Sequence, residues 1–446
     1  MDSLTGGLRE FVLLFFPILA TTFSSYLFIF VEKLLLSRLS TQAMEAAVNA
    51  AYACQIFQNP CVALAMMAQV CVGRLYGAHE WKSIGSVVWQ FIWFSLFSFF
   101  ITGPLSLIFS QYYFYGTSFQ EIVLPYFYFL VSINFLFPLG AALSCFYLGQ
   151  GKTRLVLLGT LGAQLFKLPL AYILIFGWGK IPAFGLMGGA FSTLLSQGGF
   201  CLSLLGVFLY SKHAEAFHTK EWKFQPHLFW ESIRPGSLRA INRILNTTSW
   251  AAIAYLMSSK GGDYLLALSV GGTLFFFLPC IGDAVCQTQT TIVSNLVGAG
   301  DYHLLNKAFY SGSILVLITI SLFGVPLLLF PTQTFSYLFA TITLDKASIS
   351  LIFFGVWLSF VFYTWLYVPL SYVLAFKDMN FFLIMGAMNW INGFLLMYFA
   401  INILEIEASM FWLVLSLMHG STTLLYYWRM KVLQSQVFVK AGILAT

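Results

Sequence analysis

The stretch that decides the fold occurs twice, as 72-VGRLYGAHEW-81 in the first half of the chain and as 293-VSNLVGAGDY-302 in the second. The two copies align at a constant offset, so that Val72 pairs with Val293, and the Leu, Gly and Ala positions that follow also coincide. An acidic residue and then an aromatic one close each copy. Weak internal similarity of this kind indicates a chain built from two related halves.

Composition places both halves in a membrane. Of the 446 residues, 59% are hydrophobic and only 9% are charged, whereas a soluble domain has about a quarter charged residues. Stretches of about 20 or more mainly apolar residues predict membrane-spanning helices. Twelve such stretches are present, at 11–36, 46–72, 84–109, 122–147, 155–177, 185–210, 233–258, 264–297, 307–330, 347–374, 380–404 and 409–431.

The two copies of the repeat follow the second and the eighth stretch, which is the same place in each set of six. Because six is even, both halves enter the membrane in the same direction, and such repeats are related by an axis along the membrane normal. We therefore predict an all-α polytopic membrane protein whose twelve transmembrane helices form two six-helix lobes related by a pseudo-two-fold axis. The predicted domains are an N-lobe (1–210), a cytoplasmic linker (211–232) and a C-lobe (233–446).

Charged loops predict the orientation. Fourteen Lys and Arg residues lie at the termini and in the even-numbered loops, against four in the odd-numbered loops. Because cytoplasmic loops carry the excess of Lys and Arg, we expect a multi-pass protein of the cell inner (plasma) membrane with both termini in the cytoplasm. The net charge of +6 then reflects this bias and not a nucleic-acid partner. The expected surroundings are the lipid bilayer, and the expected state is a monomer.

An ordered set of motifs runs along nearly the whole chain. The motifs are Pro17, 31-VEKLLLSRLSTQAMEAAV-48, 69-QVCVGRLYGA-78, 147-YLGQGKTR-154, 168-LPLAYILIFG-177, 185-GLMGGAFST-193, Pro235, 297-VGAGD-301 and 376-FKDM-379. Together they resemble the multidrug and toxic compound extrusion (MATE) family. The resemblance implies two lobes in a V around a central cavity, alternating access driven by H⁺ or Na⁺, and export of amphiphilic compounds. It also implies that Glu32 occupies the place of the family's cation-coupling acid in the first helix.

The chain also departs from the family's pattern. In the fifth helix the family has Asn and then Asn or Asp, where this chain has Lys167 and Ala171. The seventh and tenth helices, 239-RAINRILN-246 and 363-YTWLYVP-369, lack the carboxylates that several bacterial members place there. We therefore expect no cation site in the second lobe. Asp283 stands where the family more often has a small residue.

Six formal charges lie three or more residues inside the ends of the predicted spans, and they sum to +2. Ions inside a membrane protein face the bundle interior and usually pair with one another. Glu32 can therefore pair with Lys167 in the first lobe, and Asp283 with an arginine of the seventh helix in the second. The alternative is that some reach the membrane interface or only fasten helices together. The six residues are Glu32, Lys33, Lys167, Arg239, Arg243 and Asp283.

Two sets of functional residues follow. Glu32 and Lys167 are the predicted cation-coupling residues, with H⁺ rather than Na⁺ as the ion, because a nearby ammonium opposes a sodium cage. We expect no cofactor, no metal ligands and no catalytic residues. Polar side chains in the spans are candidates for the substrate cavity, although glutamines also serve as plain interhelical hydrogen-bonding groups. The cavity candidates are Ser25, Gln55, Gln69, Gln164, Arg243, Asn246, Asp283 and Tyr363.

The predicted function is an H⁺-coupled antiporter that exports amphiphilic small molecules. A lipid-linked precursor flippase of the same broad superfamily is the first alternative, but those relatives tend to have more helices. A membrane-embedded enzyme is the second, but the two intramembrane carboxylates, Glu32 and Asp283, fall in different lobes. The excess of basic residues in the spans favours anionic, zwitterionic or neutral substrates. If every base is paired or turned to the interface, organic cations remain possible.

Overall fold

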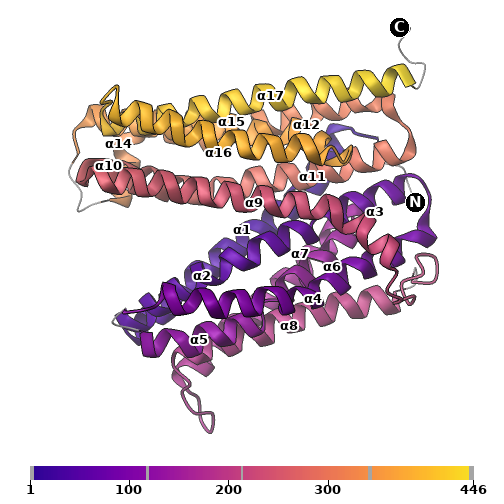
Figure 1. The fold of residues 1–446 in the computed structure, drawn as a ribbon, viewed down its shortest axis with the longest axis horizontal. Helices are drawn as coiled ribbons and strands as arrows, with labels where there is room; N and C mark the ends of the chain where they lie inside the picture. Colours follow the sequence, from indigo (N-terminus) through magenta and orange to yellow (C-terminus); the bar gives the residue numbers. More distant parts are fainter. Residues whose placement is uncertain (1–4, 117–119, 212–213, 340–343, 441–446) are drawn as a thin grey trace. The chain divides into compact units, whose positions relative to one another are not determined.

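The computed structural model describes residues 5–116, 120–211, 214–339 and 344–440, and long helices make up most of this chain (Figure 1). A π-helical turn (Ile320–Gly324) and two 3-10 turns (Tyr302–Leu304 and Ala408–Met410) complete the helical segments. The α-helices are α1 (Leu8–Leu39), α2 (Thr41–Ala65), α3 (Met67–Gly77), α4 (Trp81–Tyr113), α5 (Gln120–Ser132), α6 (Leu136–Gly149), α7 (Thr153–Phe176), α8 (Leu186–Tyr210), α9 (Pro226–Lys260), α10 (Gly262–Phe277), α11 (Pro279–Ala299), α12 (Leu305–Thr319), α13 (Val325–Leu329), α14 (Pro331–Leu338), α15 (Lys346–Ala375), α16 (Met379–Asn402) and α17 (Phe411–Lys440).

Each of the twelve predicted spans coincides with one helix or with consecutive helices. Among the described residues, 10 helical segments are long and apolar enough to cross a membrane, and α10 with α11 form one further span bent by 44°. The remaining predicted span is α9, which is less apolar because it carries several charged residues, among them Arg234, Arg239 and Arg243. The all-α polytopic fold predicted from the sequence is confirmed.

The chain packs as two compact units. One contains the described residues of Met1–Leu19 and Leu245–Thr446, and the other is Ala20–Ile244; we call them the C-unit and the N-unit. Helices α1 and α9 each contribute residues to both units, which hydropathy alone does not predict. The lobe boundaries at residues 210 and 232 stay a prediction, and residues 212 and 213 of the predicted linker lie outside the described chain.

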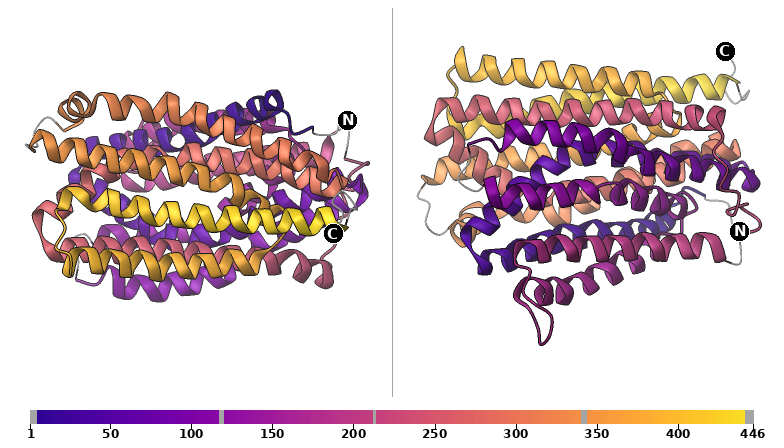
Figure 2. Two further views of the ribbon diagram at one scale, coloured as in Figure 1. Left: turned by 90° about the horizontal axis from the view of Figure 1, so that it is seen from above. Right: turned by 60° about the horizontal axis from the view of Figure 1, so that its bottom comes forward.

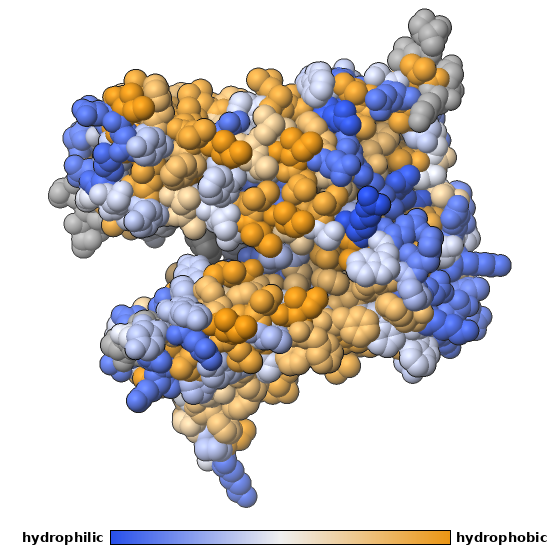
Figure 3. All heavy atoms as spheres, in the orientation of Figure 1, coloured by the Kyte–Doolittle hydropathy of each residue, from blue (hydrophilic) through white to orange (hydrophobic). Residues whose placement is uncertain are grey.

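The helices of each unit run alongside one another (Figure 2). Apolar side chains cover the flanks of the helices, and hydrophilic residues gather toward the helix ends (Figure 3). Phe100 of α4 and Leu202 of α8 are 71% and 69% exposed. Exposed apolar surface on this scale would aggregate in water, and it suits a bilayer.

The sequence repeat is also a structural repeat. In the first copy the amide of Glu80 donates a hydrogen bond to the carbonyl of Leu75 over 3.0 Å, and His79 takes a left-handed φ of 59°. The second copy has both features, because the amide of Asp301 makes the equivalent 3.0 Å bond and Gly300 has a φ of 77°. A six-residue hydrogen bond around a left-handed residue is the Schellman motif that ends helices.

The same turn ends two further helices. After α6, Gly151 takes a φ of 77° and the amide of Lys152 donates to the carbonyl five residues earlier over 2.9 Å. After α15, Lys377 takes a φ of 58° and the amide of Asp378 makes the equivalent bond over 3.0 Å. Both turns lie between predicted spans, at 149-GQGKTR-154 and 376-FKDMN-380, and they end their helices with the same hydrogen bond around a left-handed residue.

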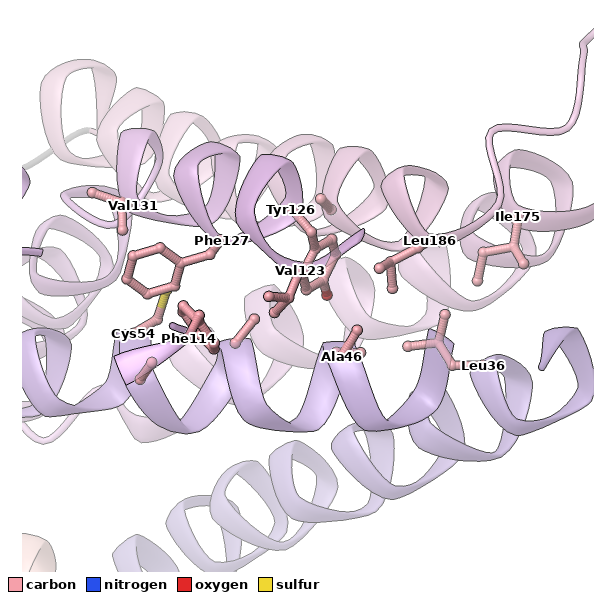
Figure 4. Packing of buried hydrophobic residues seen from close by; sticks show 14 of the residues in the cluster. Leu36, Ala46, Cys54, Phe114, Val123, Tyr126, Phe127, Val131, Ile175 and Leu186 are labelled. Atoms are coloured by element: carbon pink, nitrogen blue, oxygen red, sulfur yellow. The ribbon is translucent and has the colours of Figure 1, made fainter. Parts of the chain in front are cut away.

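One hydrophobic core in the N-unit joins α1, α2, α5, α7 and α8 (Figure 4). On α2 it uses small residues, Ala46, Ala50 and Ala53, which let large side chains such as Phe127 of α5 pack closely. Small residues at helix interfaces serve this purpose in membranes, where lipid tails provide no hydrophobic drive for association. Leu36 of α1 belongs to this core and is 2% exposed, so the core fixes the end of α1 that carries Glu32.

The segment between α8 and α9, which the sequence predicted to be a linker, docks on α4. Gly85 allows the close approach, because a Cβ there would lie 2.4 Å from the carbonyl oxygen of Phe217. Donors of α4 then bond to the backbone of the segment. These bonds run from Gly85 N to Phe217 O (3.0 Å), Trp89 Nε1 to Thr219 O (2.7 Å), Gln90 Nε2 to Lys223 O (3.2 Å) and Trp93 Nε1 to Trp222 O (3.0 Å).

Candidate functional site

The N-unit brings Glu32 and Lys167 together as the sequence predicted. Lys167 Nζ lies 2.7 Å from Glu32 Oε2, and the two side chains are 17% or less exposed. Glu32 comes from α1 and Lys167 from the middle of α7, so the ion pair ties these two helices. Removing one partner of a buried pair leaves an uncompensated charge and is strongly destabilising.

Apolar and small residues surround the pair. Leu36 and Ala171, each four residues and so about one helical turn beyond a member of the pair, are buried in the N-unit core. On α8, a Cβ at Gly189 would lie 3.7 Å from Glu32 Oε1, so this glycine leaves space beside the carboxylate. The core therefore covers one side of the ion pair. A larger residue at position 189 would crowd Glu32 Oε1.

Lys33 lies next to Glu32 in the sequence but has a different partner. Its Nζ lies 5.7 Å from the centre of the Tyr52 ring, in a cation–π arrangement. Tyr52 is 55% exposed, and exposed contacts of this kind contribute roughly 0.5–1 kcal/mol. Of the two adjacent ions, Glu32 is the one that the structure ties to another helix through an ion pair.

The predicted cavity residues divide between the two units. Ser25, Gln55, Gln69, Gln164 and Arg243 belong to the N-unit, and Asn246, Asp283 and Tyr363 belong to the C-unit. Gln69 is only 2% exposed, and the Ser25 hydroxyl donates to the carbonyl of Thr21 in its own helix over 3.0 Å. Their place in a substrate cavity stays a prediction, as does the pairing of Asp283 with Arg239 or Arg243.

The C-unit contains a polar cluster that sequence reasoning only partly found. The Tyr367 hydroxyl lies 3.4 Å from Asp283 Oδ1 and 2.7 Å from the Tyr363 hydroxyl. Gly282 permits this arrangement, because a Cβ there would lie 2.6 Å from the ring of Tyr367. The spacing of Tyr363 and Tyr367, four residues apart in 363-YTWLYVP-369, places them on one helical face. That spacing is the feature of the sequence from which the place of Tyr367 beside Tyr363 could have been predicted.

His419 of α17 completes this cluster. Its ring lies 5.4 Å from that of Tyr363 in an edge-to-face contact, and it stacks on Phe275 at 6.1 Å with an interplanar angle of 6°. The side chain is 6% exposed, and within the described chain its Nδ1 has no hydrogen-bond partner. Among the described residues, no group of three or more His, Cys, Asp and Glu could hold a metal ion.

Comparison with known proteins agrees with this fold. The MatE family model matches residues 17–173. The protein named "Probable multidrug resistance protein NorM" from Neisseria meningitidis serogroup A is 23% identical over 266 residues, and the match covers 56% of this chain and 56% of that protein. The chain thus aligns with just over half of that relative's length. The protein of the same name from Bacillus cereus is 23% identical over 437 residues, which is 95% of both chains.

Solved structures share the fold over almost the full chain. An outward-facing multidrug resistance MATE family transporter of the MOP superfamily has a TM-score of 0.85 at 13% identity, and the match covers 96% of both chains. The eukaryotic MATE transporter AtDTX14 has a TM-score of 0.77 at 17% identity, with 96% of this chain and 98% of that chain covered. A MOP superfamily transporter from Pyrococcus furiosus, described as having a binding pocket of reverse polarity, has a TM-score of 0.81 at 14% identity, with 98% of this chain and 97% of that chain covered.

The fold is that of a multi-pass α-helical membrane protein, and it is the fold of the solved MATE transporters. The chain is similar to the multidrug and toxic compound extrusion family in sequence over residues 17–173 and in fold over nearly its whole length, in agreement with the resemblance of its motifs.

Proposed function

We propose that this chain is a secondary active antiporter that exports amphiphilic small molecules by alternating access, driven by H⁺ through Glu32. The match to the MatE family model supports the general class, and the Neisseria and Bacillus relatives carry the name "Probable multidrug resistance protein NorM". The excess of Lys and Arg at the termini and even-numbered loops supports an inner-membrane protein with both termini in the cytoplasm. We further propose that it works as a monomer and as a transporter rather than an enzyme.

The observation that carries the proposal is the Glu32–Lys167 ion pair. Its 2.7 Å separation and low exposure place the carboxyl group of Glu32 directly against the amino group of Lys167. When Glu32 binds a proton, the attraction ends and the pair changes from a net charge of zero to +1. Helix α1 then loses its tie to α7. Proton binding is thereby converted into a change of helix packing, which is what a coupled transporter requires.

The same geometry favours H⁺ over Na⁺. A sodium ion would need several converging oxygens around Glu32, and Lys167 already occupies one carboxylate oxygen. A second cation at this place would be repelled by the ammonium, and this repulsion is strong in a medium of low dielectric constant. A proton adds to the carboxylate without requiring a cage of ligands.

The test is uptake of a fluorescent amphiphile by proteoliposomes under an imposed pH gradient, an imposed Na⁺ gradient or no gradient. We expect uptake with the pH gradient, and none above the empty-liposome control with the Na⁺ gradient. Accumulation driven by Na⁺ alone would reject H⁺ coupling. Equilibration without accumulation under every gradient would reject secondary active transport.

A further inference from the structure

Lys431 of α17 is held by two aromatic rings at the surface of the C-unit. Its Nζ lies 5.5 Å from the centre of the Phe309 ring on α12, and 5.6 Å from that of the Tyr427 ring one turn earlier on α17. The centres of the two rings are themselves 5.8 Å apart. Because cations are attracted to the faces of aromatic rings, the two contacts fix the place of this ammonium group between α12 and α17.

The charge of Lys431 is not neutralised within the described chain. Its ammonium group contacts the two rings, and neither α12 nor α17 contains an Asp or a Glu. Arg429, two residues earlier, differs in this respect, because its Nε lies 2.7 Å from Asp378 Oδ2. An ammonium group has three hydrogens to donate, so Lys431 can bind an anion from outside the chain.

The depth of Lys431 in the membrane indicates which anion can reach it. Lys431 ends the predicted span 409–431, and the span 307–330 begins two residues before Phe309. The lysine and its two rings therefore lie where the apolar part of each helix meets water, which is the level of the lipid head groups. In the proposed orientation this is the cytoplasmic leaflet, whose anionic lipids attract basic residues.

Exposed apolar side chains continue from Lys431 toward the middle of the membrane. Leu424 and Leu417 precede Lys431 by two and four helical turns and lie on about the same face of α17. They are 69% and 64% exposed. On α12, Tyr310 and Leu317 are also exposed and are also seven residues apart. An acyl chain can lie against these side chains while its head group reaches Lys431.

We propose that Lys431, Phe309 and Tyr427 form a binding site for one anionic phospholipid. The phosphate accepts hydrogen bonds from the ammonium group of Lys431, and an acyl chain lies along Leu424 and Leu417. A zwitterionic phospholipid fits less well, because Lys431 repels the cationic part of its head group. The site takes a lipid and not the exported substrate, so it goes beyond the proposed function and does not depend on it.

The test is native mass spectrometry of the full-length protein in detergent, titrated with one ligand at a time. The ligands are phosphatidylglycerol, phosphatidylcholine with the same acyl chains, and inorganic phosphate. We expect the first phosphatidylglycerol to bind more tightly than the other two. Lys431→Gln should weaken this first binding about fivefold, which is the contribution of one basic residue at an anionic membrane surface.

Three results would overturn the proposal. An unchanged affinity for phosphatidylglycerol in Lys431→Gln would exclude this lysine as the ligand of the lipid. Equal affinity of the wild type for the two phospholipids would exclude selection by head-group charge. Inorganic phosphate that binds as tightly as phosphatidylglycerol would mean that the site recognises a free anion and not a lipid.

Lys307→Gln is the matched control, because it removes the same charge at the same level of the membrane. Lys307 is exposed on nearly the opposite side of α12 from Phe309, since two residues are more than half a helical turn. Its Nζ lies near the N-terminal segment instead, 3.9 Å from the place of a Cβ at Gly7. This variant should bind the first phosphatidylglycerol as the wild type does. A loss equal to that in Lys431→Gln would mean that general surface charge, and not this site, attracts the lipid.

Conservative variants separate the site from a failure to fold. Lys431→Arg keeps a positive charge over the rings, and Tyr427→Phe keeps both rings, so both should retain the affinity of the wild type. Tyr427→Leu removes one ring and should weaken the first binding. Equal affinity in Tyr427→Leu and Tyr427→Phe would overturn the role of the rings.

Discussion

Lys167 Nζ and Glu32 Oε2 lie 2.7 Å apart, between two helices that are separated in sequence by five other helices of the N-unit. The pair joins α1 to α7, the two helices for which the sequence predicted the cation-coupling residues. Glu32 thus has a basic partner on another helix. In the proposed mechanism, protonation of Glu32 changes both the local charge and the contact between α1 and α7.

The first prediction concerns stability. Lys167→Gln should lower the free energy of unfolding by about 3 kcal/mol, because it leaves the mostly buried Glu32 charge without its partner. Glu32→Leu combined with Lys167→Met should recover most of this loss, since an apolar pair of similar volume is often as stable as a buried ion pair. Denaturant titration of the single and double variants in detergent measures both effects. Strictly additive losses would show that the two side chains do not interact.

The second prediction concerns substrate charge. Lys33, Arg239 and Arg243 outnumber Asp283 once Glu32 and Lys167 are paired, so the charged residues in the interior of the predicted spans keep an excess charge of +2. A charged cleft of low dielectric constant selects among ions. The wild type should therefore bind anionic or neutral amphiphiles more tightly than matched cations. A binding panel that varies only the head-group charge measures this preference.

The two members of the pair should shift that preference in opposite directions. Lys167→Gln should improve binding of the cation relative to the anion, and Glu32→Gln should do the reverse. Tight binding of the cation by the wild type, unchanged in Lys167→Gln, would contradict an influence of this pair on substrate choice.

The third prediction concerns the docked segment between α8 and α9. Gly85→Val should release it from α4, because a Cβ at position 85 would lie 2.4 Å from the Phe217 carbonyl oxygen. The exposed Lys220 and Lys223 should then become faster sites of trypsin cleavage. Gly162→Ala on α7 is the control, since a Cβ there meets nothing within 4 Å. Equal cleavage rates in the two variants would show that the docking is not held by Gly85.

The fourth prediction uses the repeated turn. Gly300→Ala should cost about 1 kcal/mol of stability, because its φ of 77° is left-handed and its surroundings are open. His79→Gly, at the matching position of the first copy, should not lower stability. His79 has a left-handed φ of 59°, and glycine adopts such a conformation more readily than histidine. Thermal unfolding of both variants provides the measurement. If His79→Gly lowered stability as much as Gly300→Ala, the left-handed backbone conformation would not be the cause of the loss of stability.

Much of the fold could be predicted from two features of the sequence. Long apolar stretches indicate membrane-spanning helices, and the repeat indicates two related halves. The Glu32–Lys167 pair could be predicted because an ion inside a membrane protein needs a partner, and few candidates exist in the first half. The contact of Tyr367 with Asp283 could not, since a tyrosine hydroxyl has no formal charge and fits an apolar helix.

Other features depend on tertiary packing that leaves no pattern in the sequence. The segment after α8 has a polar composition, and its docking depends on tryptophan N–H groups of α4 that meet backbone carbonyls. The division of α1 and α9 between the two units depends on which helices they pack against. Neither property changes the hydropathy of a helix.

The central claim is that Glu32 binds the driving proton. Its most direct test compares substrate accumulation under a pH gradient with substrate exchange at equilibrium, in proteoliposomes of wild type, Glu32→Gln and Glu45→Gln. Glu45 is an exposed carboxylate on α2 and serves as the control. The account predicts that Glu32→Gln keeps exchange but loses accumulation, while Glu45→Gln keeps both. Undiminished pH-driven accumulation by Glu32→Gln would contradict it.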